Sequence, residues 1–179
     1  PPSILLPPSP VTVLAGNPAS FTASVNGTAP FVYQWRKNGV NIPGATSATL
    51  SYVSIAATNA GSYSVVVGNA AGSATSADAT LTVLLPPSIV TQPLNTVATP
   101  GSTAVLTVVA SGDAPLTYQW FKAGNPLADG GNISGVNTTT LTVTTVSTND
   151  VADYFVKMDN AYGSTTSAVR SEEHTSELQ

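Results

Sequence analysis

Residues able to do chemistry are few in this chain, and most of them are aspartates. The closest acidic pair is Asp150 and Asp153 in TNDVADY, which as general acid and base would need a cleft and neighbours to hold them. Asp113 and the string STND (147–150) offer oxygens for calcium, but such a site needs six or more converging ligands. We expect Asp150 to order a turn and Asp153 to be solvated. The sequence therefore predicts no enzyme, no cofactor and no metal site.

Composition narrows the possible partners. Charged residues make up 8% of the 179 residues and the net charge is −4, so the chain lacks the basic surface that holds nucleic-acid phosphates. No apolar run approaches the ~20 residues of a membrane-spanning helix. Cysteine is absent, so disulfides are impossible. The chain begins at Pro1 and its one methionine is Met158, from which we expect an internal piece of a longer protein.

The elements that would position these residues come in two copies. GTAPFVYQW (27–35) and GDAPLTYQW (112–120) lie 85 residues apart, as do the two PPSI strings. NAAGSATSA (69–77) and NAYGSTTSA (160–168) lie 91 apart, which predicts a six-residue insertion in the second copy, within NPLADGGNISGVN. Apolar residues alternate with polar ones in short runs bounded by turn residues, which is typical of half-buried strands. The pattern predicts an all-β fold of two antiparallel sandwiches.

Each copy resembles an immunoglobulin-like domain of the I-set kind. The resemblance rests on one tryptophan per copy and on a tyrosine followed by N-A-x-G, as in YSVVVGNAAG (63–72) and YFVKMDNAYG (154–163). It implies that each tryptophan lies in the core over an inter-sheet disulfide and that each tyrosine forms a tyrosine corner. The cysteine positions carry aliphatic residues instead. The expected core residues are Trp35, Tyr63, Ala23 and Val65 in the first copy, and Trp120, Tyr154, Val108 and Val156 in the second.

We therefore expect one domain over residues 1–84 and a second over 85–169. Residues 170–179, RSEEHTSELQ, do not continue the pattern: Arg-Ser-Glu-Glu-His stands where the first copy has the strand ATLTV (79–83). This string resembles the translated read-through of a common short-read sequencing adapter. We expect it to lie outside the second sandwich as a disordered, non-native tail.

The second copy differs from the first on one outward face. If Trp120 and Tyr154 point inward, Phe121 and Phe155 must point outward on neighbouring strands, with Tyr162 in the adjoining turn. The first copy has Arg36, Ser64 and Ala71 at these positions. The aromatic residues could form a face that binds a protein or a polysaccharide, or they could simply stiffen the sheet through cross-strand packing.

Tandem domains without cysteines resemble those of large bacterial surface or secreted proteins. This resemblance implies a non-enzymatic structural or adhesion segment at the cell surface or outside the cell, with neighbouring repeats in the full chain. Two alternatives stay open: a carbohydrate- or protein-binding module that uses the aromatic face, and an accessory region of a secreted hydrolase.

Overall fold

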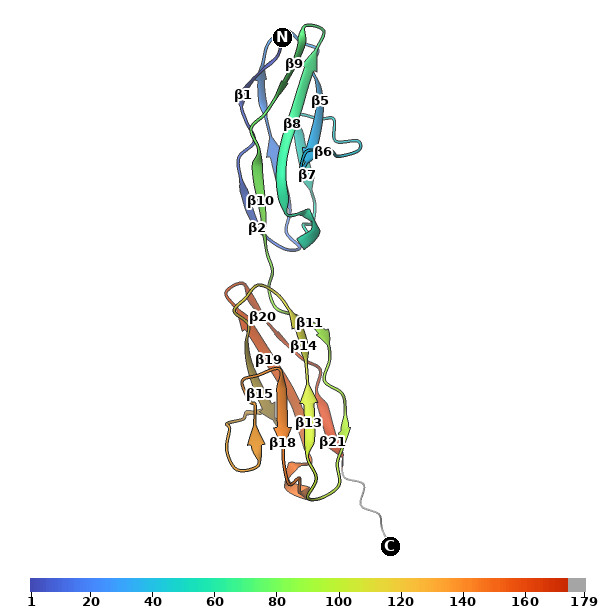
Figure 1. Cartoon of the computed structure of the whole chain (residues 1–179), viewed down its shortest axis with the longest axis vertical. Coiled ribbons are helices and arrows are strands. Elements are labelled where there is room, and N and C mark those ends of the chain that lie inside the picture. The colour runs from blue at the N-terminus through green and yellow to red at the C-terminus, as the bar shows by residue number, and fades with distance from the viewer. Residues whose placement is uncertain (174–179) are drawn as a thin grey trace. The chain divides into compact units, whose positions relative to one another are not determined.

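The computed structural model describes residues 1–173, with side chains to residue 170. The chain forms two compact units, Pro1–Leu85 and Pro86–Gln179, called domain 1 and domain 2 below. The boundary falls one residue from the expected one. Both are built from strands that pair antiparallel, apart from one parallel pair each, and both contain one short 3₁₀ turn (Figure 1), so the predicted fold class is confirmed.

Domain 1 is a sandwich whose larger sheet has the order β2-β10-β8-β5-β6, with β9 also paired to β8. On the other side β1 pairs with β4, and β3 with β7. The elements are β1 (Ser3–Leu6), β2 (Val11–Leu14), β3 (Ala19–Thr22), β4 (Ser24–Asn26), β5 (Val32–Lys37), β6 (Val40–Asn41), β7 (Thr49–Tyr52), η1 (Ala57–Asn59), β8 (Gly61–Asn69), β9 (Gly72–Thr75) and β10 (Ala79–Leu84).

Domain 2 repeats this topology: its larger sheet has the order β12-β21-β19-β15-β16, with β20 paired to β19. Its elements are β11 (Ser88–Thr91), β12 (Thr96–Val97), β13 (Ala104–Thr107), β14 (Val109–Ser111), β15 (Thr117–Lys122), β16 (Asn125–Pro126), β17 (Ile133–Ser134), β18 (Thr140–Val143), η2 (Thr148–Asp150), β19 (Asp153–Asn160), β20 (Gly163–Thr166) and β21 (Arg170–Glu173). The insertion predicted from the repeat spacing contains β17, which adds a strand beside β18. Domain 1, described throughout, has a two-stranded β3–β7 sheet at that place.

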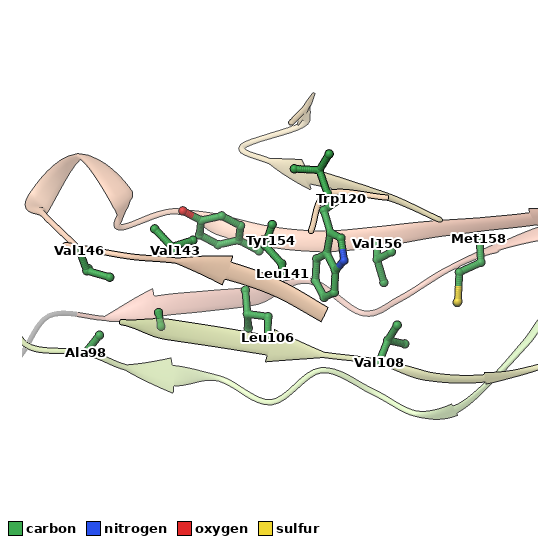
Figure 2. Packing of buried hydrophobic residues seen from close by; sticks show 12 residues of the cluster. Ala98, Leu106, Val108, Trp120, Leu141, Val143, Val146, Tyr154, Val156 and Met158 are labelled. Carbon is green, nitrogen blue, oxygen red and sulfur yellow. The ribbon is translucent and has the colours of Figure 1, made fainter. Parts of the chain in front are cut away.

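Each domain has its own core of alternating inward residues. The core of domain 1 centres on Phe21, Trp35 and Tyr63, with the Phe21 and Tyr63 rings stacked at 4.8 Å. The core of domain 2 centres on Trp120, Leu141 and Met158, part of which Figure 2 shows. Burial of these aliphatic and aromatic side chains, at about 1.5–3 kcal/mol each, is the main source of stability that the sequence offers.

The repeated prolines and glycines meet at one end of each sandwich. Gly112 has φ +139°, and a Cβ there would lie 2.9 Å from the Pro86 carbonyl oxygen and 3.0 Å from the Pro87 Cα. Gly27 has φ +131° and approaches Pro1 and Pro2 in the same way. Glycine is needed at both places for its backbone conformation and for the close approach. The PPSI and G-x-A-P strings therefore recur together because the glycine of the second string packs against the prolines of the first in each domain.

The expectation that the last strand stops before residue 170 is wrong. Strand β21 begins at Arg170, runs to Glu173, and pairs with β19 on one side and with β12 on the other. Strand pairing uses backbone N–H and C=O groups, which every residue except proline supplies, so a change in side-chain type does not end the strand. The rest of the expected tail, including His174, lies outside the described residues.

Candidate functional site

The two tryptophans occupy equivalent places in the two cores. Both are fully buried, and each indole N–H donates to a backbone carbonyl, Trp35 to Ser47 at 2.9 Å and Trp120 to Thr138 at 2.9 Å. Such a partner is what a buried indole requires.

The expected cysteine positions hold small aliphatic side chains around each tryptophan. In register, Trp35 lies beside Val65 and Trp120 beside Val156. Ala23 belongs to the same core as the first pair and Val108 to the same core as the second. Figure 2 shows Val108 and Val156 reaching from opposite sheets into the space beside Trp120. Aliphatic packing therefore fills the place where the resemblance implies a disulfide.

Both tyrosines form a corner with the turn that precedes their strand. The Tyr63 hydroxyl donates to the Asn59 carbonyl at 2.7 Å, and the Tyr154 hydroxyl donates to the Asp150 carbonyl at 2.8 Å. Burial raises the pKa of Tyr63 well above its usual value, and its interaction with Tyr52 adds to the rise. Both hydroxyls are thus fixed structural donors.

Asp150 orders its turn through four hydrogen bonds. Its carboxylate accepts from the Ser147 backbone N–H and hydroxyl, both at 3.0 Å, from the Lys122 ammonium at 3.0 Å, and from Asn132 Nδ2 at 3.3 Å. Burial alone would raise the pKa of Asp150, but the hydrogen bonds from Lys122 and Ser147 outweigh it and hold the pKa below its ordinary value of 3.8. The carboxylate is therefore ionised at neutral pH and fully engaged, which leaves it no role as a general base.

The other candidate acids do not gather into a catalytic or metal site. Asp153 is exposed and lies outside this hydrogen-bond cluster. Within residues 1–173, no three His, Cys, Asp or Glu residues lie close enough together to hold a metal ion. In the same part of the chain, no helix has the length and apolarity needed to cross a membrane.

The repeated glutamine and serine positions also have a structural explanation, which the sequence reasoning missed. Gln34 Nε2 donates to the carbonyls of Trp35 and Ile42, and Gln119 Nε2 donates to those of Trp120 and Leu127. In each domain a buried serine lies between two consecutive strands that pair with the same neighbour: Ser76 between β9 and β10, beside β8, and Ser167 between β20 and β21, beside β19. Ser76 and Ser167 accept from the Val65 and Val156 N–H groups at 3.0 Å. The sequence did contain a signal for these roles: the glutamine recurs in both YQW strings, and the serine recurs in NAAGSATSA and NAYGSTTSA.

The outward face of domain 2 carries an aromatic pair. Phe121 and Phe155 are directly opposite each other on β15 and β19. Their rings stack with centroids 4.8 Å apart and planes 6° from parallel. The neighbour of Phe121 on its other side is Pro126 in β16. Both phenylalanines are half-buried, so the pair covers the sheet and still reaches solvent.

Tyr162 does not join this pair. It lies in the turn between β19 and β20, and five residues of strand, about 16 Å, separate Phe155 from the end of β19. The binding face of Phe121, Phe155 and Tyr162 stays a prediction, in which Tyr162 would lie apart from the stacked pair. The turn adjoins the opposite end of the strand, a consequence of strand length that the motif spacing does not reveal.

Comparison with known proteins places the chain in a family. The family model described as an immunoglobulin domain matches residues 1–69 and again 86–160. Roundabout homolog 1 of Rattus norvegicus is 30% identical over 176 residues, covering 91% of this chain and 11% of its own length. The basement membrane-specific heparan sulfate proteoglycan core protein of Mus musculus is 32% identical over 131 residues, covering 72% of this chain and 4% of its own length.

Among solved structures, that of the insect immune protein hemolin has a TM-score of 0.77 at 17% identity, covering 97% of this chain and 47% of that one. Because the family model matches both halves of the chain, the chain belongs to the immunoglobulin domain family, as a tandem pair. It spans about a tenth or less of the length of the two relatives named above. Those relatives come from rat and mouse and do not support the expected bacterial source.

Proposed function

We propose that this chain is a non-enzymatic structural and adhesive segment of a longer cell-surface or secreted protein. The observation that carries the proposal is that a strand near the start of each domain pairs in parallel with the domain's last strand. In domain 1, β2 runs parallel to β10 over four residue pairs, from Val11–Leu81 to Leu14–Leu84. A force that pulls the two ends of the domain apart acts along β2 and β10 in opposite directions. The hydrogen bonds between the two strands then bear the force at the same time and not one after another. This topology suits a spacer that bears tension.

Two further observations support this proposal. The carboxylate of Asp150 and the corner tyrosines are all engaged in structural hydrogen bonds, as a structural role for these residues requires. One relative is by name a basement membrane-specific core protein, which favours a place outside the cell.

The source and the tail of the chain remain predictions. The bacterial source was implied by a resemblance to the cysteine-free tandem domains of large bacterial surface proteins, and adapter read-through by the resemblance of the string at 170–179 to a translated adapter. The gene, read from the source DNA through and beyond the codon for Val169, tests both. Further immunoglobulin repeats with a secretion signal or anchor would support the proposed spacer. A hydrolase domain next to these repeats would favour an accessory role and would contradict the spacer proposal.

A second candidate function is favoured by the Phe121–Phe155 pair: a binding module that uses the outward face of domain 2. Domain 1 has Arg36 and Ser64 at the paired positions, and Arg36 donates from Nε to Asn41 Oδ1 at 2.9 Å. The same sheet therefore forms with polar residues there. The fold therefore does not require the two phenylalanines, and a role in binding would explain why domain 2 has them.

A further inference from the structure

An apolar row crosses the outward face of domain 2. Its residues are Pro126 on β16, Phe121 on β15, Phe155 on β19 and Val169 just before β21. The register sets Phe121 beside both Pro126 and Phe155. Val169 lies at the break between β20 and β21, directly before Arg170, which pairs with Tyr154, the residue next to Phe155. Val169 is 52% exposed. We call these four residues the apolar row.

The ring geometry decides which class of ligand suits the apolar row. The ring centroids are 4.8 Å apart with planes 6° from parallel, and neighbouring strands are themselves about 4.8 Å apart. Each ring therefore stands on its own strand with one face against the other ring, and presents mainly its edge to solvent. A sugar ring packs against an exposed aromatic face, so this arrangement suits apolar protein side chains better than a polysaccharide.

The charges beside the apolar row indicate which protein fits. Outward positions alternate along each strand, so Lys157 and Asp159 share the outward face of β19 with Phe155. They pair with each other at 2.9 Å and are nearly half exposed. Their cross-strand neighbours on β15 are Gln119 and Thr117, which are uncharged. Asp153, exposed at the start of β19, lies on this face by the same alternation. The outward positions of β15 and β19 thus carry one positive and two negative charges, too few to attract a strongly charged partner.

We propose that this face binds the same face of a second molecule of this chain, an inference that rests on the adhesive part of the proposed function. A two-fold axis along the strands, midway between β15 and β19, exchanges every cross-strand pair. It sets Phe121 of one molecule against Phe155 of the other, and Phe155 against Phe121. Lys157 then faces Gln119, and Asp159 faces Thr117. Asp153, whose carbonyl accepts from the Ala123 N–H at 2.9 Å, faces Ala123. No like charges on β15 and β19 therefore oppose each other. A surface that complements itself in this way is what a two-fold interface requires.

Sedimentation equilibrium of the full chain tests the proposal. One sheet face gives a small interface, so we expect weak association. The average mass should rise above 18.1 kDa as the concentration increases from about 10 μM to about 1 mM, in the range of weak dimers. The double variant Phe121→Arg/Phe155→Ser carries the residues of domain 1 at these positions and should stay monomeric. The control Val105→Ser removes an exposed valine on β13, in the other sheet, and should associate like the wild type.

Thermal melts establish that each variant is folded before its mass is compared. A second variant, Phe121→Ser, tests the same face with a smaller change and should weaken association at least tenfold. A wild type that stays monomeric at 1 mM overturns the proposal, whether the face then binds another protein or none. Association that survives in the folded double variant also overturns it. Neither result bears on the spacer function, which the gene sequence and the force measurement below test separately.

Discussion

Substitution of Asp150 by asparagine should make the turn of domain 2 resemble that of domain 1, which has Asn59 at the matching position. The variant loses the carboxylate that accepts from Lys122 and Ser147. Lys122 still donates to the Asn149 carbonyl at 2.8 Å, as Lys37 does to the Thr58 carbonyl. Hydrogen bonds to charged groups contribute about 1.5–3 kcal/mol each. Because one amide oxygen still accepts, we expect a net loss of about 2 kcal/mol.

The effect should depend on pH with a defined sign. Folding lowers the pKa of Asp150 below 3.8, so the ionised carboxylate binds its proton more weakly in the folded state than in the unfolded one. Its stabilising contribution is complete above about pH 4 and is lost as the pH falls through the lower folded pKa. Domain 2 should therefore lose stability below about pH 4, and the Asp150→Asn variant should lose less because this contribution is already absent.

Each domain has one tryptophan, which allows the two unfolding transitions to be measured separately. In a Trp35→Phe background, fluorescence reports Trp120 in domain 2. At pH 7, a loss of about 2 kcal/mol should lower the melting temperature of domain 2 by roughly 8–16 °C. The difference in melting temperature between the Asp150→Asn variant and its parent should shrink by pH 3. A difference of the same size at pH 7 and pH 3 would refute the assigned role of the ionised carboxylate.

Three further predictions concern the packing. Trp35→Ala should cost domain 1 about 3–5 kcal/mol in a denaturant melt; a loss below about 1 kcal/mol would argue against the burial described. Gly112→Ala should destabilise domain 2 by about 1–3 kcal/mol, and more than the control Gly124→Ala, which has φ +79° and open space around a new Cβ; equal losses would show that the Pro86 contact is unimportant. Replacement of residues 170–179 by ATLTV, the sequence of 79–83, should raise the melting temperature of domain 2 by several degrees, since Leu81 is buried in domain 1; an unchanged melting temperature would contradict this.

The sequence predicted the fold from features that repeat. Alternation of apolar and polar residues fixes which side chains face inward, so the outward direction of Phe121 followed from the inward direction of Trp120. The spacing of the repeats also located the insertion. The inward and outward directions follow from the alternation of side chains along a strand, which all β-strands share.

Features that depend on strand length or on backbone pairing were not predictable in this way. The position of Tyr162 depends on how far β19 runs before it turns. Strand β21 forms through backbone hydrogen bonds, to which the change in side-chain type at Arg170 is largely irrelevant. Strand β17 has two residues, Ile133 and Ser134, too few for a pattern of alternation. The stacking of the Phe121 and Phe155 rings is a matter of rotamers, about which spacing says nothing.

The most direct test of the spacer function is to pull the full chain by its two ends in a single-molecule force experiment. Domain 1 has 85 residues, which extend to about 280–300 Å. We therefore expect two separate unfolding events, each lengthening the molecule by roughly 250 Å. The weaker event should belong to domain 2, whose parallel β12–β21 ladder has two residue pairs among the described residues, which end at Glu173, against four in domain 1. Reductant should change neither event. Featureless extension without a force peak would contradict the account.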